Sequence, residues 1–203
     1  MKSSLQEILP LIGTSMDGGF YGGRIMIDGQ AFALIVAPKV EGEHAGMAWN
    51  SSTKMVQGAM SYCDGLTNTA AMDKGGSKLA KWVRGLRIAD RDDWYLPSQD
   101  ELEIIYRNLK STSEGNTGWA RSGINLSAIP PTLPYLPMDP AQTRAEHFQE
   151  GGGEAFDPAW YWSSTQYASD GAYAWSQSFT NGTQGDLPKS HQFGARAVRR
   201  SPI

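Results

Sequence analysis

The chain has 203 residues and a mass of 22.1 kDa, which is enough for one sizeable domain with a buried core. Hydrophobic residues make up 40% and charged residues 19% of the chain, a balance that excludes an intrinsically disordered protein. The net charge of −3 gives no general attraction to phosphate backbones, and the only basic cluster is Arg196, Arg199 and Arg200. We therefore expect no nucleic acid as a partner.

The first residues predict an arm. Residues 1–13 carry one lysine and an apolar run interrupted by Pro10, too short and too polar for a signal peptide or a membrane span. We expect synthesis and folding in a cytoplasm and no membrane insertion. Residues 3–9 could form a short helix, and glycine-rich turns follow Asp17. We interpret residues 1–16 as an N-terminal arm and residues 17–203 as one domain.

A hairpin is the next predicted element. Two apolar runs, residues 24–27 and 30–36, flank Asp28-Gly29. This dipeptide accepts the positive φ angles of a two-residue turn, so the pattern predicts a β-hairpin.

A first helix is predicted after Ser51-Ser52-Thr53, whose hydroxyl groups can cap it, and Asp64-Gly65 would end it. Its apolar face would be Val56, Ala59, Met60 and Cys63. Cys63 is the only cysteine, so no internal disulfide can form, and we expect a buried structural thiol rather than a reactive one. Residues 79–86 could form another short amphipathic turn or an ordered loop.

The following motif predicts a strand, a turn and a second helix. Trp94 and Leu96 alternate as the inward residues of a short strand. Ser98 and Glu101 form an S-x-x-E capping box for a helix that should run to about Leu109.

From residue 112 to residue 158 the pattern dissolves into Gly, Ser, Pro and scattered aromatic residues. An insert of that length without regular structure is usually functional or mobile. Strands return at residues 160–165, 172–179 and 194–199, and we expect Trp162 and Trp175 to point into the core. The pattern predicts an α+β fold with a largely antiparallel sheet.

Four short motifs follow one another along the chain in a recognisable order. Residues 59–66 read AMSYCDGL, residues 93–102 read DWYLPSQDEL, residues 161–165 read YWSST and residues 196–199 read RAVR. In this order they resemble the C-type-lectin-like domain at the C-terminus of bacterial collagen-like adhesins, which is found also in phage tail and prophage proteins. The resemblance covers about residues 20–200. It implies two helices flanking a twisted sheet, paired terminal strands and a long loop region at one end.

The chain departs from its relatives in two respects. Members of the family often carry a cysteine where Ala197 stands, so the resemblance implies no disulfide from Cys63 to the last strand here. Animal C-type lectins, which are more distant relatives, bind sugar through calcium with Glu-Pro-Asn or Gln-Pro-Asp and Trp-Asn-Asp. Neither proline tripeptide occurs, and Trp49-Asn50 is followed by Ser51, so no calcium–sugar site is implied.

Motifs for catalysis are missing from the sequence. The histidines His44, His147 and His191 lack zinc-ligand spacing, and no nucleophile elbow, phosphate-binding loop or dinucleotide fingerprint occurs. Formylglycine-generating enzymes have a similar strand and helix, but they depend on active-site cysteines, and Cys63 alone supports that alternative poorly. We expect no enzyme and no cofactor.

A cation site is the remaining chemical alternative. Asp90, Asp92 and Asp93 could gather calcium, but no ligand-loop pattern is present. A solvated turn paired with Arg87 or Arg91 is the favoured interpretation, so we expect no metal.

Binding is better supported, because aromatic residues give rigid contact area and Ser, Asn and Gln give adaptable hydrogen bonds. The candidate contact residues on the loops between the last strands are Gln166, Tyr167, Asp170, Gln184, Asp186, Lys189, His191 and Gln192. The insert adds Trp119, Arg121, Tyr135, His147, Phe156 and Trp160. The alternative is that the insert packs over the sheet or forms a subunit contact.

These observations predict a non-enzymatic recognition domain. We expect a phage or prophage tail-fibre tip or receptor-binding protein in the virion tail, engaging a bacterial surface glycan or protein. The N-terminal arm would attach it to other tail proteins, in several copies that add weak contacts together; the resemblance implies a homo-oligomer, with a trimer as our expectation. The alternative is a structural protein of the tail or baseplate that contacts only other particle proteins.

Overall fold

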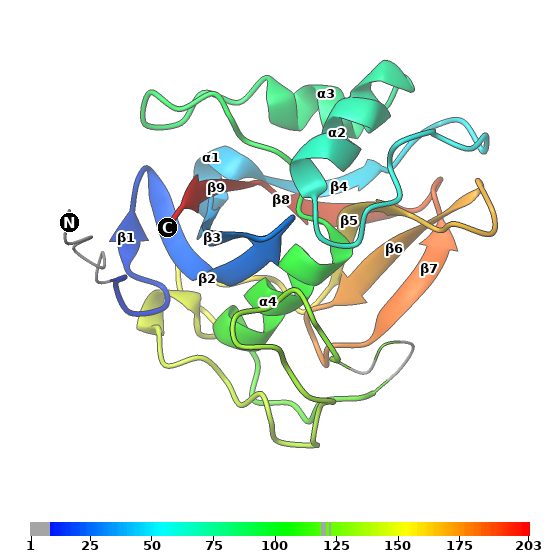
Figure 1. Ribbon diagram of the computed structural model, residues 1–203. Helices are drawn as coiled ribbons and strands as arrows, with labels where there is room; N and C mark the ends of the chain where they lie inside the picture. The colour runs from blue at the N-terminus through cyan, green and yellow to red at the C-terminus, as the bar shows by residue number, and fades with distance from the viewer. Residues whose placement is uncertain (1–8, 119–120, 122) are drawn as a thin grey trace.

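The computed structural model describes residues 9–118, 121 and 123–203 (Figure 1). Two β-sheets carry the fold, with orders β1-β2-β3-β9 and β4-β8-β5-β6-β7. The first comprises β1 (Ser15–Met16), β2 (Gly19–Ile27), β3 (Gln30–Val36) and β9 (Val198–Pro202). The second comprises β4 (Glu43–Ala48), β8 (Gln192–Arg196), β5 (Trp160–Gln166), β6 (Tyr173–Ser178) and β7 (Gln184–Pro188). All strand pairs are antiparallel except β5 with β8.

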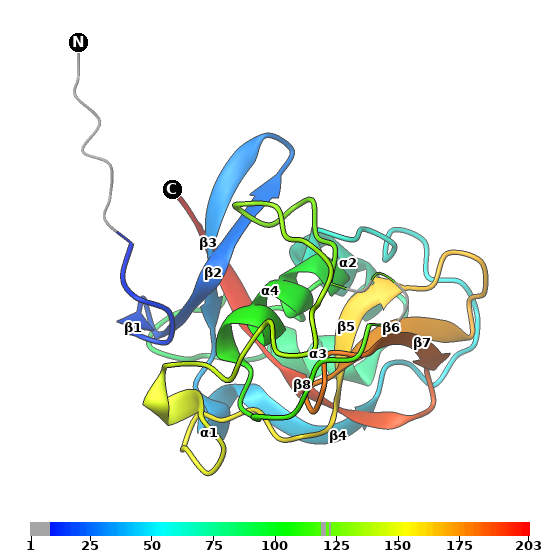
Figure 2. The same ribbon diagram turned by 90° about the horizontal axis from the view of Figure 1, so that it is seen from below.

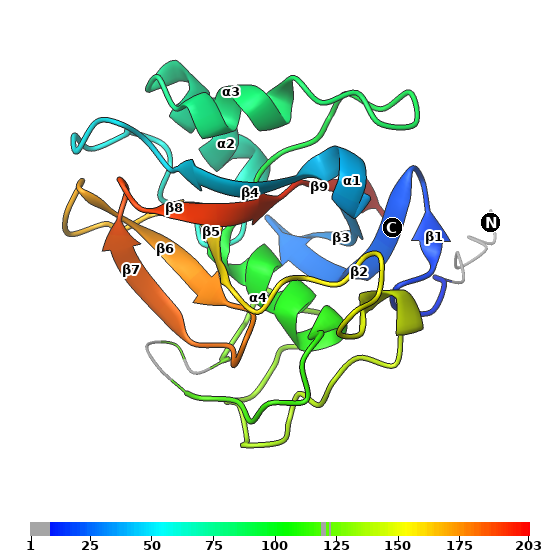
Figure 3. The same ribbon diagram turned by 180° about the vertical axis from the view of Figure 1, so that it is seen from behind.

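Helices cover the sheets from two sides. They are α1 (Lys39–Gly42), α2 (Gly65–Lys74), α3 (Lys78–Arg84) and α4 (Gln99–Leu109), with a 3-10 turn, η1 (Glu146–Phe148). Helices α2 and α3 lie on one side and α4 on the other (Figures 1 and 3). The mixed α+β class and the mainly antiparallel pairing are confirmed.

The predicted hairpin is confirmed. Ile27 pairs with Gln30, and Asp28 and Gly29 have φ angles of 49° and 79°. Both central residues therefore adopt the left-handed conformation that a two-residue hairpin turn requires.

The predicted capping box of α4 is confirmed as well. Ser98 Oγ accepts a hydrogen bond from Glu101 N at 3.3 Å, and the Glu101 carboxylate accepts one from Ser98 N at 2.7 Å. The alternation of the preceding segment also holds, since Trp94 and Leu96 join one core cluster and Tyr95 joins another. The predicted strand, however, is reduced to one bridge between Tyr95 and Val198.

The predicted helix after Ser51-Ser52-Thr53 is wrong, because residues 51–64 form an irregular loop. Asp64-Gly65 begins helix α2 instead of ending a helix, since the Asp64 carboxylate accepts a hydrogen bond from Thr67 N at 3.0 Å. Gly65 does not end a helix but lets the start of α2 pack closely against Leu96, because a Cβ there would lie 2.5 Å from Leu96 O. Cys63 is half-buried in the loop, and burial raises the pKa of its thiol.

The corrected helix start gives a testable expectation. Replacing Asp64 by alanine removes the cap and the ion pair with Arg200, whose Nη1 lies 3.0 Å from Asp64 Oδ1. We expect the free energy of unfolding to fall by about 1–2 kcal/mol, measured by urea denaturation. Asp73→Ala, which removes an exposed ion pair at the other end of α2, is the control and should cost less than about 1 kcal/mol. Equal losses in both variants would contradict the assignment.

The last strands differ from the prediction in number. Residues 184–188 form β7 where a loop was expected, and β4 was not predicted, because glycine and polar residues interrupt their apolar alternation. The single strand predicted at 194–199 is split into β8 and β9. Ala197 lies between them, where the chain passes from the five-stranded to the four-stranded sheet and donates its N–H to Gly42 O at 2.8 Å.

The insert is largely irregular, as predicted, and crosses the α4 side of the molecule (Figure 2). Buried Lys110 joins the start of the insert to its middle, because its ammonium group donates to Asn116 Oδ1 at 3.0 Å and Pro140 O at 3.3 Å. Residues 1–8 of the predicted arm lie outside the described residues, and the short helix expected there is therefore not tested. The last two residues of the predicted arm form β1. The boundary between arm and domain at residue 16 stays a prediction.

Candidate functional site

The second sheet presents a group of aromatic rings that we call the aromatic ledge: Trp160, His191 and Phe193. Trp160 stacks on Phe193 with ring centroids 6.0 Å apart and planes at 26°. His191 meets the edge of Phe193 at 5.3 Å. Trp160 and Phe193 are half-buried and His191 is exposed, so one side of this group reaches solvent.

The strand register positions the ledge. Trp160 and Trp162 lie on the same face of β5, and Phe193 of the neighbouring β8 packs against both. Trp162 is fully buried and its indole N–H donates to Met47 O at 2.9 Å, which fixes the base of the ledge to β4. The strands that carry these residues lie side by side in Figure 3.

The Trp160 ring reaches as far as Gly185 of β7. A Cβ built on this residue of β7 would lie 3.8 Å from the ring, at ordinary contact distance. The Trp160 side chain is half-buried, and a half-exposed aromatic face is suited to stacking on a sugar ring or an apolar side chain. Gln192 and Ser190 are exposed beside it and supply polar groups.

Three loop candidates are not available for contact. Gln166, Gln184 and Lys189 are 1%, 2% and 1% exposed, so their prediction as surface contacts is wrong. Strand β5 extends one residue further than expected and buries Gln166, and the unpredicted strand β7 buries Gln184.

Lys189 has a structural role instead. Its ammonium group donates to Gln166 Oε1 at 2.6 Å and lies 4.4 Å from the centre of the Trp49 ring. Burial lowers the pKa of this lysine to about 8. The contacts join β5 to the loop after β7, below the surface.

Three further candidates reach the surface, two on the loop between β5 and β6 and one within β7. Tyr167 is half-buried with its ring against the edge of Trp175, and Asp170 is exposed. Asp186 is half-buried in β7 opposite Trp175 rather than on a loop. Trp175 and Trp162 are buried, which confirms their prediction as core residues.

The candidates in the insert are mostly engaged inside the protein. Arg121 forms an ion pair with Asp100 and lies over the Tyr62 ring at 4.9 Å. The hydroxyl of Tyr135 donates to Glu103 Oε1 at 3.1 Å. Phe156 is 1% exposed, so its prediction as a contact residue is wrong, while Trp119 lies outside the described residues.

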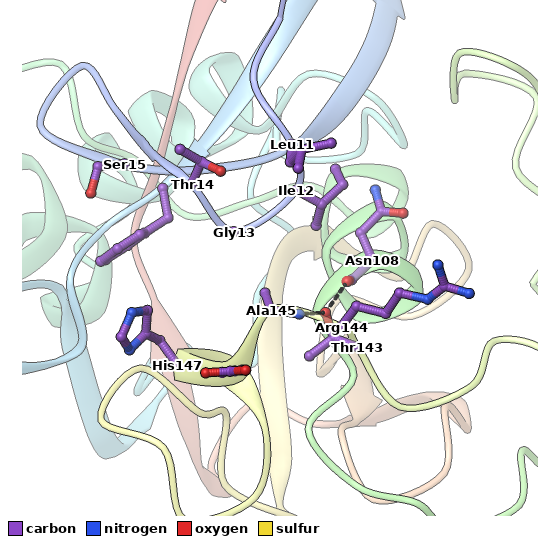
Figure 4. Close-up of a pocket in the computed structure, with 12 residues that line it drawn as sticks. Leu11, Ile12, Gly13, Thr14, Ser15, Asn108, Thr143, Arg144, Ala145 and His147 are labelled. Carbon is purple, nitrogen blue, oxygen red and sulfur yellow. Dashed lines mark hydrogen bonds between the residues drawn. The ribbon is translucent and has the colours of Figure 1, made fainter.

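His147 lies on a separate groove of about 830 Å³ between residues 11–15 and residues 143–147 (Figure 4). Thr143 Oγ1 donates to Asn108 O at 2.8 Å and fixes one wall of the groove to α4. Among the described residues that line it, the aromatic side chains are Phe20 and the His147 imidazole, so this part of the groove offers less stacking surface than the ledge.

The carboxylates and arginines are largely paired with each other. Asp93 and Asp17 flank Arg199, with Asp93 Oδ1 2.7 Å from its Nε, so the predicted pairing of the acidic turn with Arg87 or Arg91 is wrong for Asp93. Arg91 pairs with Asp17 instead. Within residues 9–118, 121 and 123–203, no three His, Cys, Asp or Glu side chains are placed to hold a metal ion.

The basic cluster at the end of the chain is likewise occupied by carboxylates. Arg196 contacts Glu43 and Glu154, and Arg200 contacts Asp64. These guanidinium groups hold strands together and do not form a free cationic surface.

Phe193 is the member of the ledge that sequence analysis missed. It follows Gln192 in a segment that was interpreted as a loop, and only its pairing with Met47 shows that it belongs to a strand. The alternation of Phe193 and Ala195 on one face could have indicated this earlier strand start.

Comparison with known proteins identifies the family. None of the helices in the described part of the chain is long and apolar enough to cross a bilayer. Comparison with curated proteins gave no match. The family model of the Lcl C-terminal domain matches residues 39–199, which is most of the chain and includes the whole five-stranded sheet, while β1, β2 and β3 lie before it. The chain therefore belongs to the Lcl C-terminal domain family, the C-terminal domain of Lcl-type adhesins, and is a recognition domain of the adhesin type.

Proposed function

We propose that this domain is a non-enzymatic recognition module with a C-type-lectin-like fold, and that it binds a bacterial surface glycan through the aromatic ledge. The family supports recognition as the general role. The observation that carries the site is the stacked pair Trp160 and Phe193 beside exposed His191, on a face of the sheet that reaches solvent. Such rings bind by contact area and need no cofactor.

The buried acids support a role without catalysis. Burial raises the pKa of Glu101 to about 7, a value that could suit a general base. Glu101 is fully buried, however, and its carboxylate accepts hydrogen bonds from Ser98 N, Gly65 N and the Tyr95 hydroxyl. Its surroundings are those of a structural cap, which a substrate could not reach.

Replacing Trp160 by alanine tests the ledge. We expect binding of the purified protein to bacterial cells to weaken by at least about 10-fold, because truncating a central aromatic contact typically costs more than 1 kcal/mol. His191→Ala, at an exposed position, should weaken binding by a smaller factor. Cell binding is measured by fluorescence of the labelled protein, and circular dichroism and thermal unfolding confirm that each variant is folded.

Tyr62→Ala is the matched control, since Tyr62 is an exposed aromatic residue outside the ledge. It should bind as the unaltered protein does. If folded Trp160→Ala and His191→Ala variants bind cells normally, the ledge is not the site. Periodate oxidation of the cells should abolish binding and protease treatment should not; the reverse result would identify a protein receptor.

The proposed setting is a phage or prophage tail, with the N-terminal arm joined to other tail proteins. Its support is the order of the four sequence motifs. The alternative is a tail or baseplate structural protein, and binding that occurs only to purified particle proteins would favour it.

A further inference from the structure

A buried lysine meets a buried carboxamide between β5 and the loop after β7. Lys189 and Gln166 are each 1% exposed, and Lys189 Nζ lies 2.6 Å from Gln166 Oε1. Since a C=O bond is about 1.23 Å long, the lysine nitrogen lies within about 3.8 Å of the carboxamide carbon, Cδ. An amine held this close to an acyl carbon is placed to react with it, because folding has already brought the two groups together.

The surroundings of Lys189 favour the nucleophilic form of its amine. In the described part of the chain, the ammonium group has two hydrogen-bond acceptors, Gln166 Oε1 and Lys54 O at 3.3 Å, and neither is a carboxylate. Burial lowers the pKa of Lys189 to about 8, although the charge of Asp170 opposes this effect. At pH 7 about a tenth of an amine with this pKa carries a free lone pair, which is the form that attacks carbonyl carbons.

The backbone stabilises the oxygen that gains charge during such an attack. Val56 N donates to Gln166 Oε1 at 2.8 Å, in the buried interior. A fixed N–H group in a site without water stabilises a developing oxyanion. The carboxamide nitrogen of Gln166 contacts Met55 Sδ, which is a weak acceptor, so few interactions hold this nitrogen in place.

We propose that Lys189 and Gln166 become joined by an isopeptide bond. The lone pair of the unprotonated Nζ forms a bond to Cδ, the bond from Cδ to Nε2 breaks, and one amine proton moves to Nε2, which leaves as ammonia. An amine and an amide thus give a new amide and ammonia, with no change of oxidation state. The product is neutral, which removes the cost of keeping an ammonium group away from water. The bond lies below the surface and is independent of what the aromatic ledge binds.

Lys110 offers a comparison within the same chain. It is also 1% exposed, and its Nζ lies 3.0 Å from a carboxamide oxygen, Asn116 Oδ1. Its ammonium group also donates to Glu114 O and Pro140 O, so three oxygens hold its three protons. The Asn116 nitrogen donates to Pro140 O at 2.8 Å and to two further carbonyl groups. We expect no bond at this pair, because the amine stays protonated and the leaving nitrogen is held.

Mass spectrometry of the purified unaltered chain tests the proposal. Its intact mass should be lower by one ammonia than the mass that its sequence gives, while Lys189→Met and Gln166→Ala should each keep the full mass of their sequences. Lys110→Met is the matched control and should still lose one ammonia. Trypsin should leave the bond between Lys189 and Ser190 uncut, because an acylated lysine is not a cleavage site. Chymotrypsin, which cuts at aromatic residues between the two positions, should release a branched peptide that contains both.

The branched peptide is obtained from the unaltered chain, so the test does not depend on the folding of any variant. An unaltered chain of full mass, complete cleavage after Lys189, or a loss of ammonia without the branched peptide would overturn the proposal. A loss of ammonia that persists in Lys189→Met and disappears in Lys110→Met would overturn it as well.

Discussion

Replacing Arg196 by methionine is expected to lower the free energy of unfolding by about 3–5 kcal/mol, because it leaves buried carboxylates without their cation. Arg196 is 1% exposed. Its guanidinium group donates to Ala37 O at 2.6 Å and to Glu43 Oε2 at 3.0 Å, and it also pairs with Glu154. One side chain thus ties β8 to β4, to the end of β3 and to the end of the insert.

The loss should depend on pH. Burial raises the pKa of Glu43, while Arg196 counteracts that effect. Without Arg196 the carboxyl group takes up a proton more readily, so the difference in stability between Arg196→Met and the unaltered protein should shrink between pH 7 and pH 4. Chemical denaturation at both pH values measures it. Arg196→Lys is the control, with a smaller loss, because an ammonium group keeps the charge but not the planar fork. A pH-independent loss would indicate that packing against Phe156, rather than charge, is what the arginine supplies.

Replacing Glu101 by alanine is expected to cost at least about 3 kcal/mol, because buried donors lose their acceptor. The Glu101 carboxylate accepts from Gly65 N at 3.1 Å, Ser98 N at 2.7 Å and the Tyr95 hydroxyl at 2.7 Å. It therefore joins the starts of α2 and α4. Glu101→Gln keeps one oxygen for the two backbone donors, so it should cost much less.

Glu101 should also make stability depend on pH. Burial raises its pKa from 4.5 to about 7, so the folded state binds this proton more tightly than the unfolded state. The contribution is fully present below about pH 4.5 and is lost as the pH rises to about 7, up to about 3 kcal/mol. Buried Asp100 and Glu103 shift in the same direction, and Asp17 and Asp64 in the opposite one.

The difference between the unaltered protein and Glu101→Gln isolates this carboxyl group. Unfolding free energies from pH 4.5 to pH 8 should fall less steeply in Glu101→Gln. Parallel curves would show that the hydrogen bonds from the backbone outweigh burial and keep the carboxylate ionised.

The sequence predicted local motifs correctly where the residues that form their hydrogen bonds lie within a few positions of each other. The Asp28-Gly29 turn and the Ser98–Glu101 capping box depend on backbone angles and on hydrogen bonds across three residues. The Asp64-Gly65 motif shows the limit of this reasoning. The Asp64 side chain caps the helix that follows. Glycine is required at position 65 because a Cβ there would clash with Leu96 O, which lies 31 positions further along the chain.

The candidate site was predicted only in part for the same reason. Tyr167, Asp170 and His191 do reach the surface, and Trp160 and His191 were recognised as possible contacts. Gln166 and Lys189 were misplaced, because they satisfy each other inside the fold, and polar residues are buried when a partner from a distant segment is available.

By itself the sequence determined the α+β class, the hairpin, helix α4 and the family, since these follow from patterns read along the chain. Only the tertiary structure decided which side of each polar strand is buried, which arginines are paired and which rings meet. Burial, ion pairing and ring stacking depend on contacts between segments far apart in sequence, such as Trp160 with Phe193. They depend also on how fully the neighbouring elements exclude water from these side chains.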